Sequence, residues 1–207
     1  MTDPRVQIVE RGYDRIADTF AAWRDEIEGD PRAEWAGDLS SRLPDGARVL
    51  ELGCGAGAAE TIELARRFRL TGVDVSAEQI SRARERVPGA EFVHADFLEL
   101  ELSDESFDAE CSFYVFNHVP REHLGPLMVR IAGWLRPGGL ALNAFGASDL
   151  EGWTGEWLGA ETYFSGYEPP ENRRLVEAAG LTILRDEVVE FEEPEGPARF
   201  HWILGRK

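Results

Sequence analysis

The sequence predicts an α/β fold whose sheet is mostly parallel and ends with antiparallel strands. From Ala47 to Phe145, short strand-like segments alternate with helix-like segments, which is typical of parallel βαβ units. Two long strand-like segments joined by a short turn follow near the end, as in a hairpin. The chain has 207 residues, which is enough for one sizeable core and too few for two comfortable domains.

The elements before the first strand are helical. Residues 6–27 place apolar side chains at helical spacing, and a second helix is expected near residues 31–43. The side chains expected on the buried face of the first helix are Ile8, Tyr13, Ile16, Phe20 and Trp23. We therefore predict an N-terminal helical cap over residues 1–46, followed by the main domain over residues 47–207.

The main domain supplies the remaining elements in order. Strands are expected at residues 47–52, 70–75, 91–95, 107–112 and 140–145, and the final hairpin at 181–191 and 198–206. Helices are expected at residues 58–68 and 76–87, in a segment ending at 134–136, and from 171 to 180. Ser76 with Gln79 forms a capping box, which puts Asp74 at the end of a strand.

Residues 146–170 form a long connection rich in aromatic side chains. Long segments without predicted secondary structure are more often functional than idle, so we expect a lid loop here. The aromatic residues of the segment are Trp153, Trp157, Tyr163, Phe164 and Tyr167.

Composition excludes some partners. Lys plus Arg number 22 against 39 Asp plus Glu, a net charge of -17 that repels nucleic acids and anionic membranes. Cys54 and Cys111 stand alone in sequence, so neither a zinc site nor a disulfide framework is indicated. No signal peptide or membrane span is expected. These features favour a cytoplasmic protein, a monomer or homodimer.

The stretch ELGCGAG, Glu51 to Gly57, follows the first strand of the main domain. Gly53, Gly55 and Ala58 satisfy GxGxxG/A, and Asp74 lies about twenty residues further on, where a carboxylate meets ribose hydroxyls. Glycines at this position let the backbone approach a nucleotide closely. On these residues alone, an NAD-dependent enzyme fits as well as any other nucleotide-binding protein.

Three observations favour S-adenosylmethionine over NAD. Glu51 puts a carboxylate close to where an anionic pyrophosphate would lie, whereas a cationic amino-acid moiety would be attracted. Asp96 and Phe97 follow the third strand and offer an acceptor for an exocyclic amine and a ring for a purine. The chain also leaves little material for a second nucleotide-binding half.

The motifs ELGCGAG, GVDVS, HADF, FDAECSFYVFNHVP and LRPGG, in this order, resemble the class I S-adenosylmethionine-dependent methyltransferases. The similarity covers Ala47 to Leu142 and is greatest to the small-molecule branch near the ubiquinone/menaquinone-biosynthesis (type 11) enzymes. It implies a Rossmann-like sheet of seven strands with helices on both faces, S-adenosylmethionine as cofactor and a small-molecule acceptor. It does not specify that acceptor.

The resemblance also implies a cofactor site. Tyr13, in a YDxxA segment, is expected to fold over the cofactor, and the loop residues to lie under its methionine part. Asp74 is expected to hold the ribose, and Asp96 and Phe97 the adenine. The implied cofactor-binding residues are Tyr13, Glu51, Gly53, Cys54, Gly55, Gly57, Asp74, Val75, Asp96, Phe97, Ser112 and Phe113.

Methyl transfer mainly requires the acceptor to be held in line with the reacting methyl group, so a general base is optional. His118, in NHVP, and Tyr163 are the candidate catalytic residues. An aromatic pocket for the acceptor is expected from Phe20, Trp23, Tyr114, Trp153, Trp157 and Tyr167. No carboxylate cluster for a metal is evident, because Asp149 and Glu151 form only a pair.

Two other functions stay open on the sequence. A protein that binds S-adenosylmethionine without transferring its methyl group would keep the same motifs. An NAD-linked oxidoreductase is the other alternative.

Overall fold

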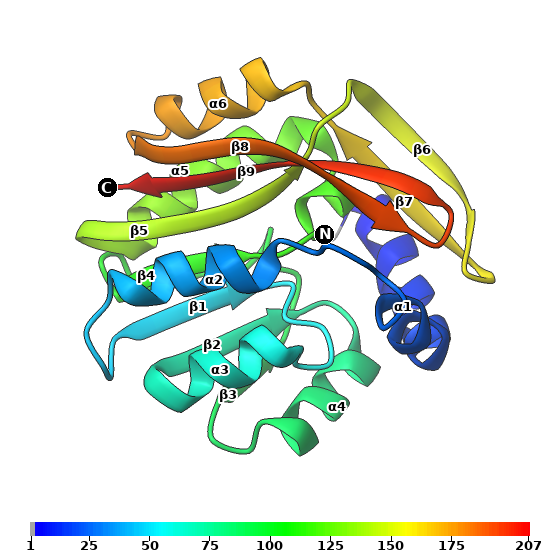
Figure 1. Cartoon of the computed structure of the whole chain (residues 1–207), viewed down its shortest axis with the longest axis horizontal. Helices are drawn as coiled ribbons and strands as arrows, with labels where there is room; N and C mark the ends of the chain where they lie inside the picture. Colours follow the sequence, from blue (N-terminus) through cyan, green and yellow to red (C-terminus); the bar gives the residue numbers. More distant parts are fainter. Residues whose placement is uncertain (1–2) are drawn as a thin grey trace.

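A twisted sheet of seven strands forms the centre of the computed structural model, which describes residues 3–207 (Figure 1). Its strand order is β3-β2-β1-β4-β5-β9-β8. Pairings from β3 to β5 are parallel, and β9 is antiparallel to both β5 and β8. The predicted fold class is confirmed. The seven strands are β1 (Arg48–Leu52), β2 (Arg69–Asp74), β3 (Glu91–His94), β4 (Phe107–Ser112), β5 (Leu135–Gly146), β8 (Thr182–Glu193) and β9 (Gly196–Arg206).

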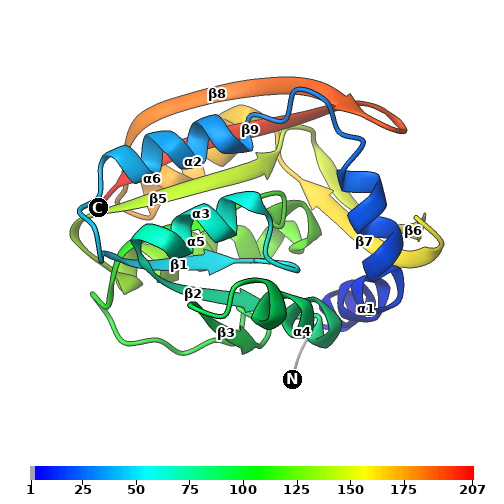
Figure 2. The same ribbon diagram turned by 60° about the horizontal axis from the view of Figure 1, so that its bottom comes forward.

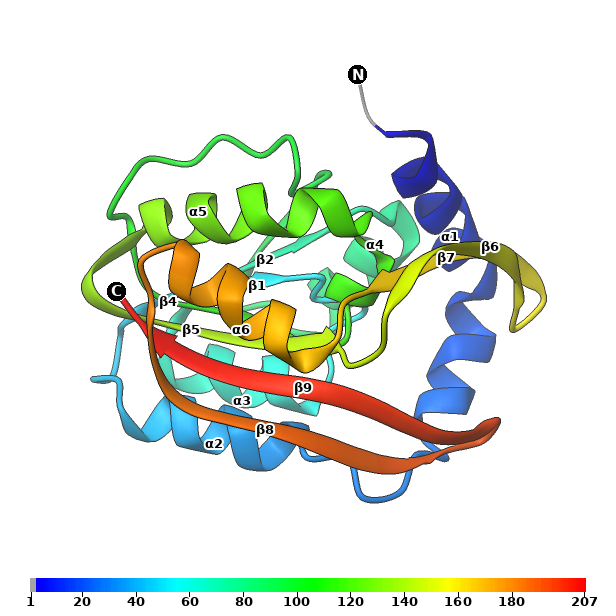
Figure 3. The same ribbon diagram turned by 90° about the horizontal axis from the view of Figure 1, so that it is seen from above.

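Helices cover both faces of this sheet. Helices α2 and α3 lie on one face, and α5 and α6 lie on the other (Figure 3). The strands between them are buried on both sides, so even the polar side chains of VLEL and AECS, Glu51, Glu110 and Ser112, are enclosed. The helices are α1 (Pro4–Arg24), α2 (Arg32–Ser41), α3 (Ala59–Arg67), α4 (Ala77–Arg86), α5 (Leu124–Trp134) and α6 (Pro169–Ala178), with short 3-10 turns η1 (Phe116–His118) and η2 (Arg121–His123).

The start of α4 follows the predicted capping box. The Ser76 hydroxyl accepts a hydrogen bond from the Gln79 backbone N–H at 3.1 Å. Because a helix leaves its first N–H groups unpaired, this side chain fixes where α4 begins. Asp74 is thereby left at the carboxyl end of β2, one turn before the helix.

Helix α1 crosses the carboxyl ends of β1 and β2 instead of packing on a face of the sheet (Figures 1 and 2). On one side, the Asp14 carboxylate accepts from the Ser76 hydroxyl at 2.6 Å and from the Glu78 N–H at 3.2 Å. On the other side, a Cβ at Gly12 would lie 2.6 Å from the Glu161 carbonyl oxygen, so α1 and β7 touch backbone to backbone. The predicted cap helix is thus held between α4 and β7.

Two segments differ from the sequence prediction. Residues 146–170 are not a loop, because β6 (Leu150–Trp157) and β7 (Ala160–Gly166) pair as an antiparallel hairpin beside α1. The turn between them has positive φ at Leu158 and Gly159, as in a tight two-residue hairpin turn. Strand β5 also begins earlier than expected, and residues 137–139 form an irregularity within it, where the register with β4 shifts.

Candidate functional site

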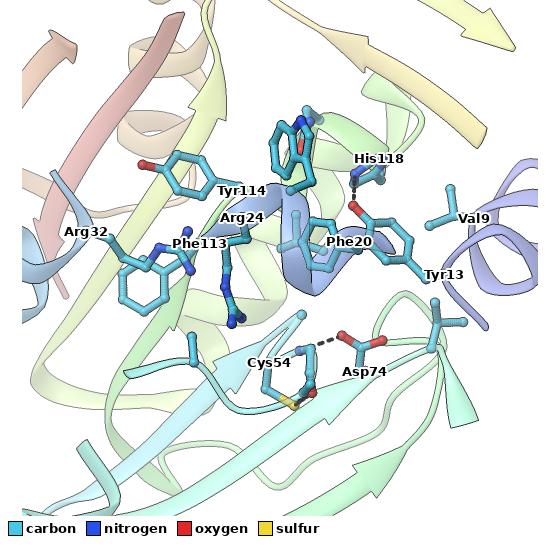
Figure 4. A pocket seen from close by; sticks show the side chains of 18 of the residues that line it. Val9, Tyr13, Phe20, Arg24, Arg32, Cys54, Asp74, Phe113, Tyr114 and His118 are labelled. Atoms are coloured by element: carbon cyan, nitrogen blue, oxygen red, sulfur yellow. Dashed lines mark hydrogen bonds between the residues drawn. The ribbon is translucent and has the colours of Figure 1, made fainter. Parts of the chain in front are cut away.

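A cavity of about 170 Å³ opens at the carboxyl ends of the parallel strands (Figure 4). It lies where the chain order of the sheet reverses, between β1 and β4, which is where open α/β sheets bind ligands. Helix α1 and the β6-β7 hairpin close it from outside. The predicted site residues that line it are Tyr13, Phe20, Trp23, Gly53, Cys54, Gly55, Asp74, Val75, Phe97, Phe113, Tyr114, His118 and Trp157.

The glycine loop forms the floor of the cavity. Gly53 has a φ of 69°, and a Cβ there would lie 2.5 Å from the Val115 Cβ, so no other residue fits without moving the loop. The Gly55 N–H donates to Asp74 Oδ2 at 2.8 Å, and the Ser76 N–H donates to Oδ1 at 2.9 Å. Burial raises the pKa of Asp74. Asp74 therefore joins the loop to the start of α4.

Glu51 lies behind this loop and does not line the cavity. Glu51 is 3% exposed, and its Oε1 accepts a hydrogen bond from the Thr61 hydroxyl at 2.9 Å. Burial raises the pKa of Glu51 to about 8. The Glu51 carboxyl therefore links β1 to α3. We expected it to face the cavity, and it does not line it.

A second, smaller cavity of about 30 Å³ adjoins the first and is lined by Asp96 and Phe97. Phe97, Val75 and His118 line both cavities. Asp96 Oδ1 accepts from the Leu98 N–H at 2.9 Å, whereas Oδ2 is buried without a partner among residues 3–207. Burial raises the pKa of Asp96. A buried oxygen without a partner is costly, so it fits a ligand that donates a hydrogen bond.

Tyr13 and His118 form a hydrogen-bonded pair in the cavity wall. The distance from the Tyr13 hydroxyl to His118 Nε2 is 2.9 Å, and His118 Nδ1 is 2.9 Å from the Tyr163 carbonyl oxygen. A carbonyl only accepts, so Nδ1 carries the proton, Nε2 accepts, and Tyr13 donates. Burial lowers the pKa of His118 to about 4. The imidazole is therefore neutral at neutral pH, with both ring nitrogens paired.

The predicted aromatic side of the cavity is present. The Phe20 ring stacks on Trp23 at 5.8 Å, and Trp23 meets Trp157 of the hairpin edge to face at 5.1 Å. Tyr114, two residues after the end of β4, has a left-handed conformation with a φ of 57°, which is costly for a residue other than glycine. Its hydroxyl donates to Asp30 Oδ1 at 2.6 Å, which fixes its ring in the wall.

Other predicted site residues lie elsewhere. The Tyr163 ring is buried in the hairpin, and its hydroxyl lies 3.5 Å from the Glu151 carbonyl oxygen. Only the backbone of Tyr163 therefore reaches His118. Trp153 is 43% exposed, and the Tyr167 ring lies beneath the Arg121 guanidinium. The Ser112 hydroxyl accepts from Asn143, and Gly57 packs against α4. The predicted residues outside the main cavity lining are Glu51, Gly57, Asp96, Ser112, Trp153, Tyr163 and Tyr167.

Several lining residues were not predicted. Arg24 follows Phe20 by one helical turn on α1, and Arg32 is the first residue of α2. An arginine on a helix is usually a solvated residue, so only its spacing from Phe20 could have revealed it. The unpredicted lining residues include Val9, Arg24, Ile27, Arg32, Val115, Asn117, Glu193 and Phe200.

None of the helices in the described part of the chain is long and apolar enough to cross a membrane. Within residues 3–207, no three His, Cys, Asp or Glu side chains are grouped so that they could hold a metal ion.

Residues 49–139 match a family model described as a methyltransferase domain. This segment is a class I methyltransferase domain. It carries the glycine loop, Asp74, Asp96 and His118. The recognition made on the motifs is confirmed.

The methyltransferase domain has a curated relative in the 27-O-demethylrifamycin SV methyltransferase of Amycolatopsis mediterranei. The two are 32% identical over 168 residues, which cover 70% of this chain and 61% of that protein. The chain spans about half the length of the curated relatives it matches.

Solved structures share the fold. The 1,6-didemethyltoxoflavin-N1-methyltransferase of Burkholderia thailandensis, solved with its acceptor and S-adenosylhomocysteine, is 22% identical. The TM-score is 0.68, and the superposition covers 100% of this chain and 91% of the Burkholderia chain. The [4+2]-cyclase SpnF is 20% identical with a TM-score of 0.74, covering 100% of this chain and 97% of its own. At these identities the likeness concerns the fold alone.

Proposed function

We propose that the cavity binds S-adenosylmethionine and that the protein transfers its methyl group to a small organic acceptor. The observation that carries this proposal is the composition of the cavity. The glycine loop and Asp74 of a methyltransferase domain stand on one side, and an aromatic wall stands on the other. When bound, S-adenosylmethionine supplies a methyl group already activated by its sulfonium.

The residues present fit this cofactor. Asp96 Oδ2, buried without a partner, suits a donor such as the exocyclic amine of adenine, and Phe97 offers its ring beside it. Asp74 lies at the strand end, where a ribose is held in nucleotide-binding α/β folds. Gly53, Cys54 and Gly55 leave the cavity floor without bulky side chains. We therefore assign the adenine to the side of Asp96 and the methionine part to the side of the glycine loop.

The chain's own contribution is positioning and exclusion of water. Tyr13, Phe20 and Trp157 form a wall that an apolar or aromatic acceptor can contact. Holding two reactants in the right geometry can lower a barrier by roughly 7–11 kcal/mol, so orientation alone can supply much of the rate.

His118 has a positioning role in this proposal. Its Nε2 already accepts from Tyr13 and its Nδ1 already donates to Tyr163, so no ring nitrogen is free to take an acceptor proton. It holds the Tyr13 hydroxyl in one orientation at the cavity wall. The predicted catalytic use of Tyr163 has no support from the position of its ring.

Asp96→Asn tests the cofactor assignment. We expect it to weaken binding of S-adenosylhomocysteine by about tenfold, because the amide cannot accept at both positions. Oδ1 can still accept from the Leu98 N–H, so the melting temperature should stay near that of the wild type. Asp104→Asn, at an exposed position, is the matched control. Calorimetric titration gives the affinities, and an unchanged affinity in Asp96→Asn would contradict the adenine assignment.

Two alternatives are decided by direct measurements. An NAD-linked oxidoreductase would be stabilised against heat by NAD and not by S-adenosylmethionine. A protein that binds the cofactor without methyl transfer would bind S-adenosylhomocysteine yet release none with any acceptor. The fold leaves this second case open, since a cyclase shares it. Release of S-adenosylhomocysteine with a panel of phenols, thiols, amines and carboxylates would establish transfer.

We also propose a cytoplasmic location, a small assembly and metal-independent transfer. Both cysteines are free and buried, which is compatible with a reducing cytoplasm. We expect a monomer or homodimer, which light scattering can determine. We also expect transfer to proceed without a metal, so EDTA should leave the rate unchanged.

A further inference from the structure

Two arginines project into the cavity, in a protein with a net charge of -17. Arg24 reaches from the end of α1 toward the loop that carries Cys54, and Arg32 enters beside Tyr114 (Figure 4). Their side chains are only 20% and 11% exposed. Burying a guanidinium is unfavourable unless something negative compensates it, so each needs a partner.

Arg32 has partners within the protein. Its Nη2 donates to Asp30 Oδ2 at 2.9 Å, and its guanidinium lies 4.8 Å from the centre of the Tyr114 ring. These contacts hold Arg32 in the wall and compensate part of its charge, but its Nε is buried without a partner among residues 3–207. Arg32 therefore has a close ion pair within the protein and one donor left for a ligand.

Arg24 is different. Within residues 3–207, Arg24 forms its ion pair with Asp25 at 3.6 Å, and the Asp25 side chain is 76% exposed. Burial and then the neighbouring Arg32 lower the pKa of Arg24. Glu193 also lines the cavity, but it forms no ion pair with Arg24 in the described chain, and burial raises its pKa to about 7. A weakly compensated guanidinium thus points into a cavity where a ligand is expected.

Two titratable groups of the cavity, Asp74 and His118, support the same conclusion. Both oxygens of Asp74 accept backbone hydrogen bonds, and both nitrogens of His118 are paired. An acceptor that must lose a proton is poorly served by these groups. An acceptor that is already an anion at neutral pH needs no base, and its charge would compensate Arg24.

We propose that the methyl acceptor carries a carboxylate and that Arg24 binds this carboxylate inside the cavity. This inference rests on the proposed function, because it names the acceptor class of the same site. A guanidinium can donate two parallel hydrogen bonds to a carboxylate, which fixes orientation as well as affinity. Phe20, one helical turn before Arg24, places an aromatic surface beside that carboxylate.

The cofactor itself brings one carboxylate, so the experiment separates two sources. The full chain is saturated with S-adenosylhomocysteine and titrated with matched pairs of probes. These are cinnamate and cinnamamide, benzoate and benzamide, and octanoate and octanamide. We expect at least one acid to bind about tenfold more tightly than its amide.

Arg24→Gln should remove most of that preference, lowering the affinity for the acid about tenfold and leaving that for the amide unchanged. Arg24→Lys should keep part of it, because the charge remains without the two-pronged geometry. Arg15→Gln, on an exposed position of the same helix, should behave as wild type. Glu193→Gln should leave acid binding intact or strengthen it, since it removes a negative charge from the cavity.

Three results would overturn the inference. The first is a wild-type protein that binds none of the acids better than its amide. The second is an Arg24→Gln variant that loses as much affinity for S-adenosylhomocysteine as for the acid, which would assign Arg24 to the cofactor's carboxylate. The third is loss of turnover in Glu193→Gln with an uncharged acceptor, which would reveal a base and a neutral substrate. Failure of the wild type to bind S-adenosylhomocysteine would refute the proposed function separately.

Discussion

The Tyr13 hydroxyl on α1 donates a hydrogen bond to His118 Nε2 over 2.9 Å, although the two residues are 105 positions apart. The bond joins the N-terminal helix to the segment after β4. It also fixes the tautomer of His118, whose other nitrogen donates to the hairpin. Helix α1, the sheet and the hairpin are therefore connected through one imidazole ring.

Removing the Tyr13 hydroxyl should destabilise the protein. In Tyr13→Phe the buried Nε2 of His118 loses its donor, which costs ~1–2 kcal/mol of unfolding free energy. Urea denaturation followed by fluorescence measures this change. Tyr167→Phe is the control, because the Tyr167 ring lies beneath Arg121 and outside the cavity. Equal stability of Tyr13→Phe and wild type would show that the hydrogen bond is not formed in solution.

His118 should make stability fall in acid. Its pKa is lowered from 6.5 to about 4 in the folded protein by burial, so the unfolded chain binds the proton more readily. The stabilisation is present above pH 6.5 and is lost as the pH falls toward 4, by roughly 3 kcal/mol in total. We expect His118→Gln to flatten this part of the curve of unfolding free energy against pH. His94→Gln, at an exposed position, should not change it.

Glu110 should make the free energy of unfolding fall as the pH rises, opposite to the effect of His118. It is 1% exposed in β4, where Asn143 Nδ2 donates to both carboxyl oxygens, and burial raises its pKa from 4.5 to about 8. The folded protein thus holds this proton more tightly than the unfolded chain does, and stability declines as the pH rises from 4.5 to 8.

Glu110→Gln removes this titration. We expect the variant to gain roughly 4 kcal/mol over wild type near the upper end of that range and little at the lower end. Melting temperatures across the range test it, with the exposed Glu63→Gln as control. A constant difference between Glu110→Gln and wild type at every pH would mean that Glu110 does not titrate as expected.

Gly53→Ala should damage the cavity floor. The new Cβ would lie 2.5 Å from Val115, and the φ of 69° is unfavourable for alanine. Gly46→Ala separates the two effects, because Gly46 has a φ of 77° with open space around it. We expect ~1 kcal/mol of destabilisation at Gly46 and clearly more at Gly53. Only Gly53→Ala should also weaken binding of S-adenosylhomocysteine, as calorimetry can measure.

The sequence predicts the parallel part of the fold well, for physical reasons. Strand-like segments alternate with helix-like segments from Ala47 to Phe145, and the Ser76 capping box marks the start of α4, so local signals and tertiary structure agree there. The β6-β7 hairpin escaped prediction because β6 is largely exposed on both faces, so it lacks the alternation that identifies a strand. Its turn at Leu158-Gly159 was the available signal.

The candidate site was predictable where backbone geometry determines it. Gly53, Asp74 and Phe97 lie at or just after strand ends, and parallel strands bring their ends together at one edge of the sheet. Glu51 also lies close to a strand end, but side chains alternate between the two faces along β1, and this directs the Glu51 carboxyl under α3. Arg24 could not be recognised as a cavity residue, because its environment depends on how α1 docks across the sheet.

The attachment of α1 also bears on when the cavity is completed during synthesis. Tyr13 and Trp23 are made before the groups that hold them, with Trp23 Nε1 donating to Glu195 across 172 positions. Contacts so distant in sequence form late, because the intervening chain must be ordered first. The part of the cavity wall formed by Tyr13 and Trp23 is therefore complete only once the chain has been made as far as Glu195.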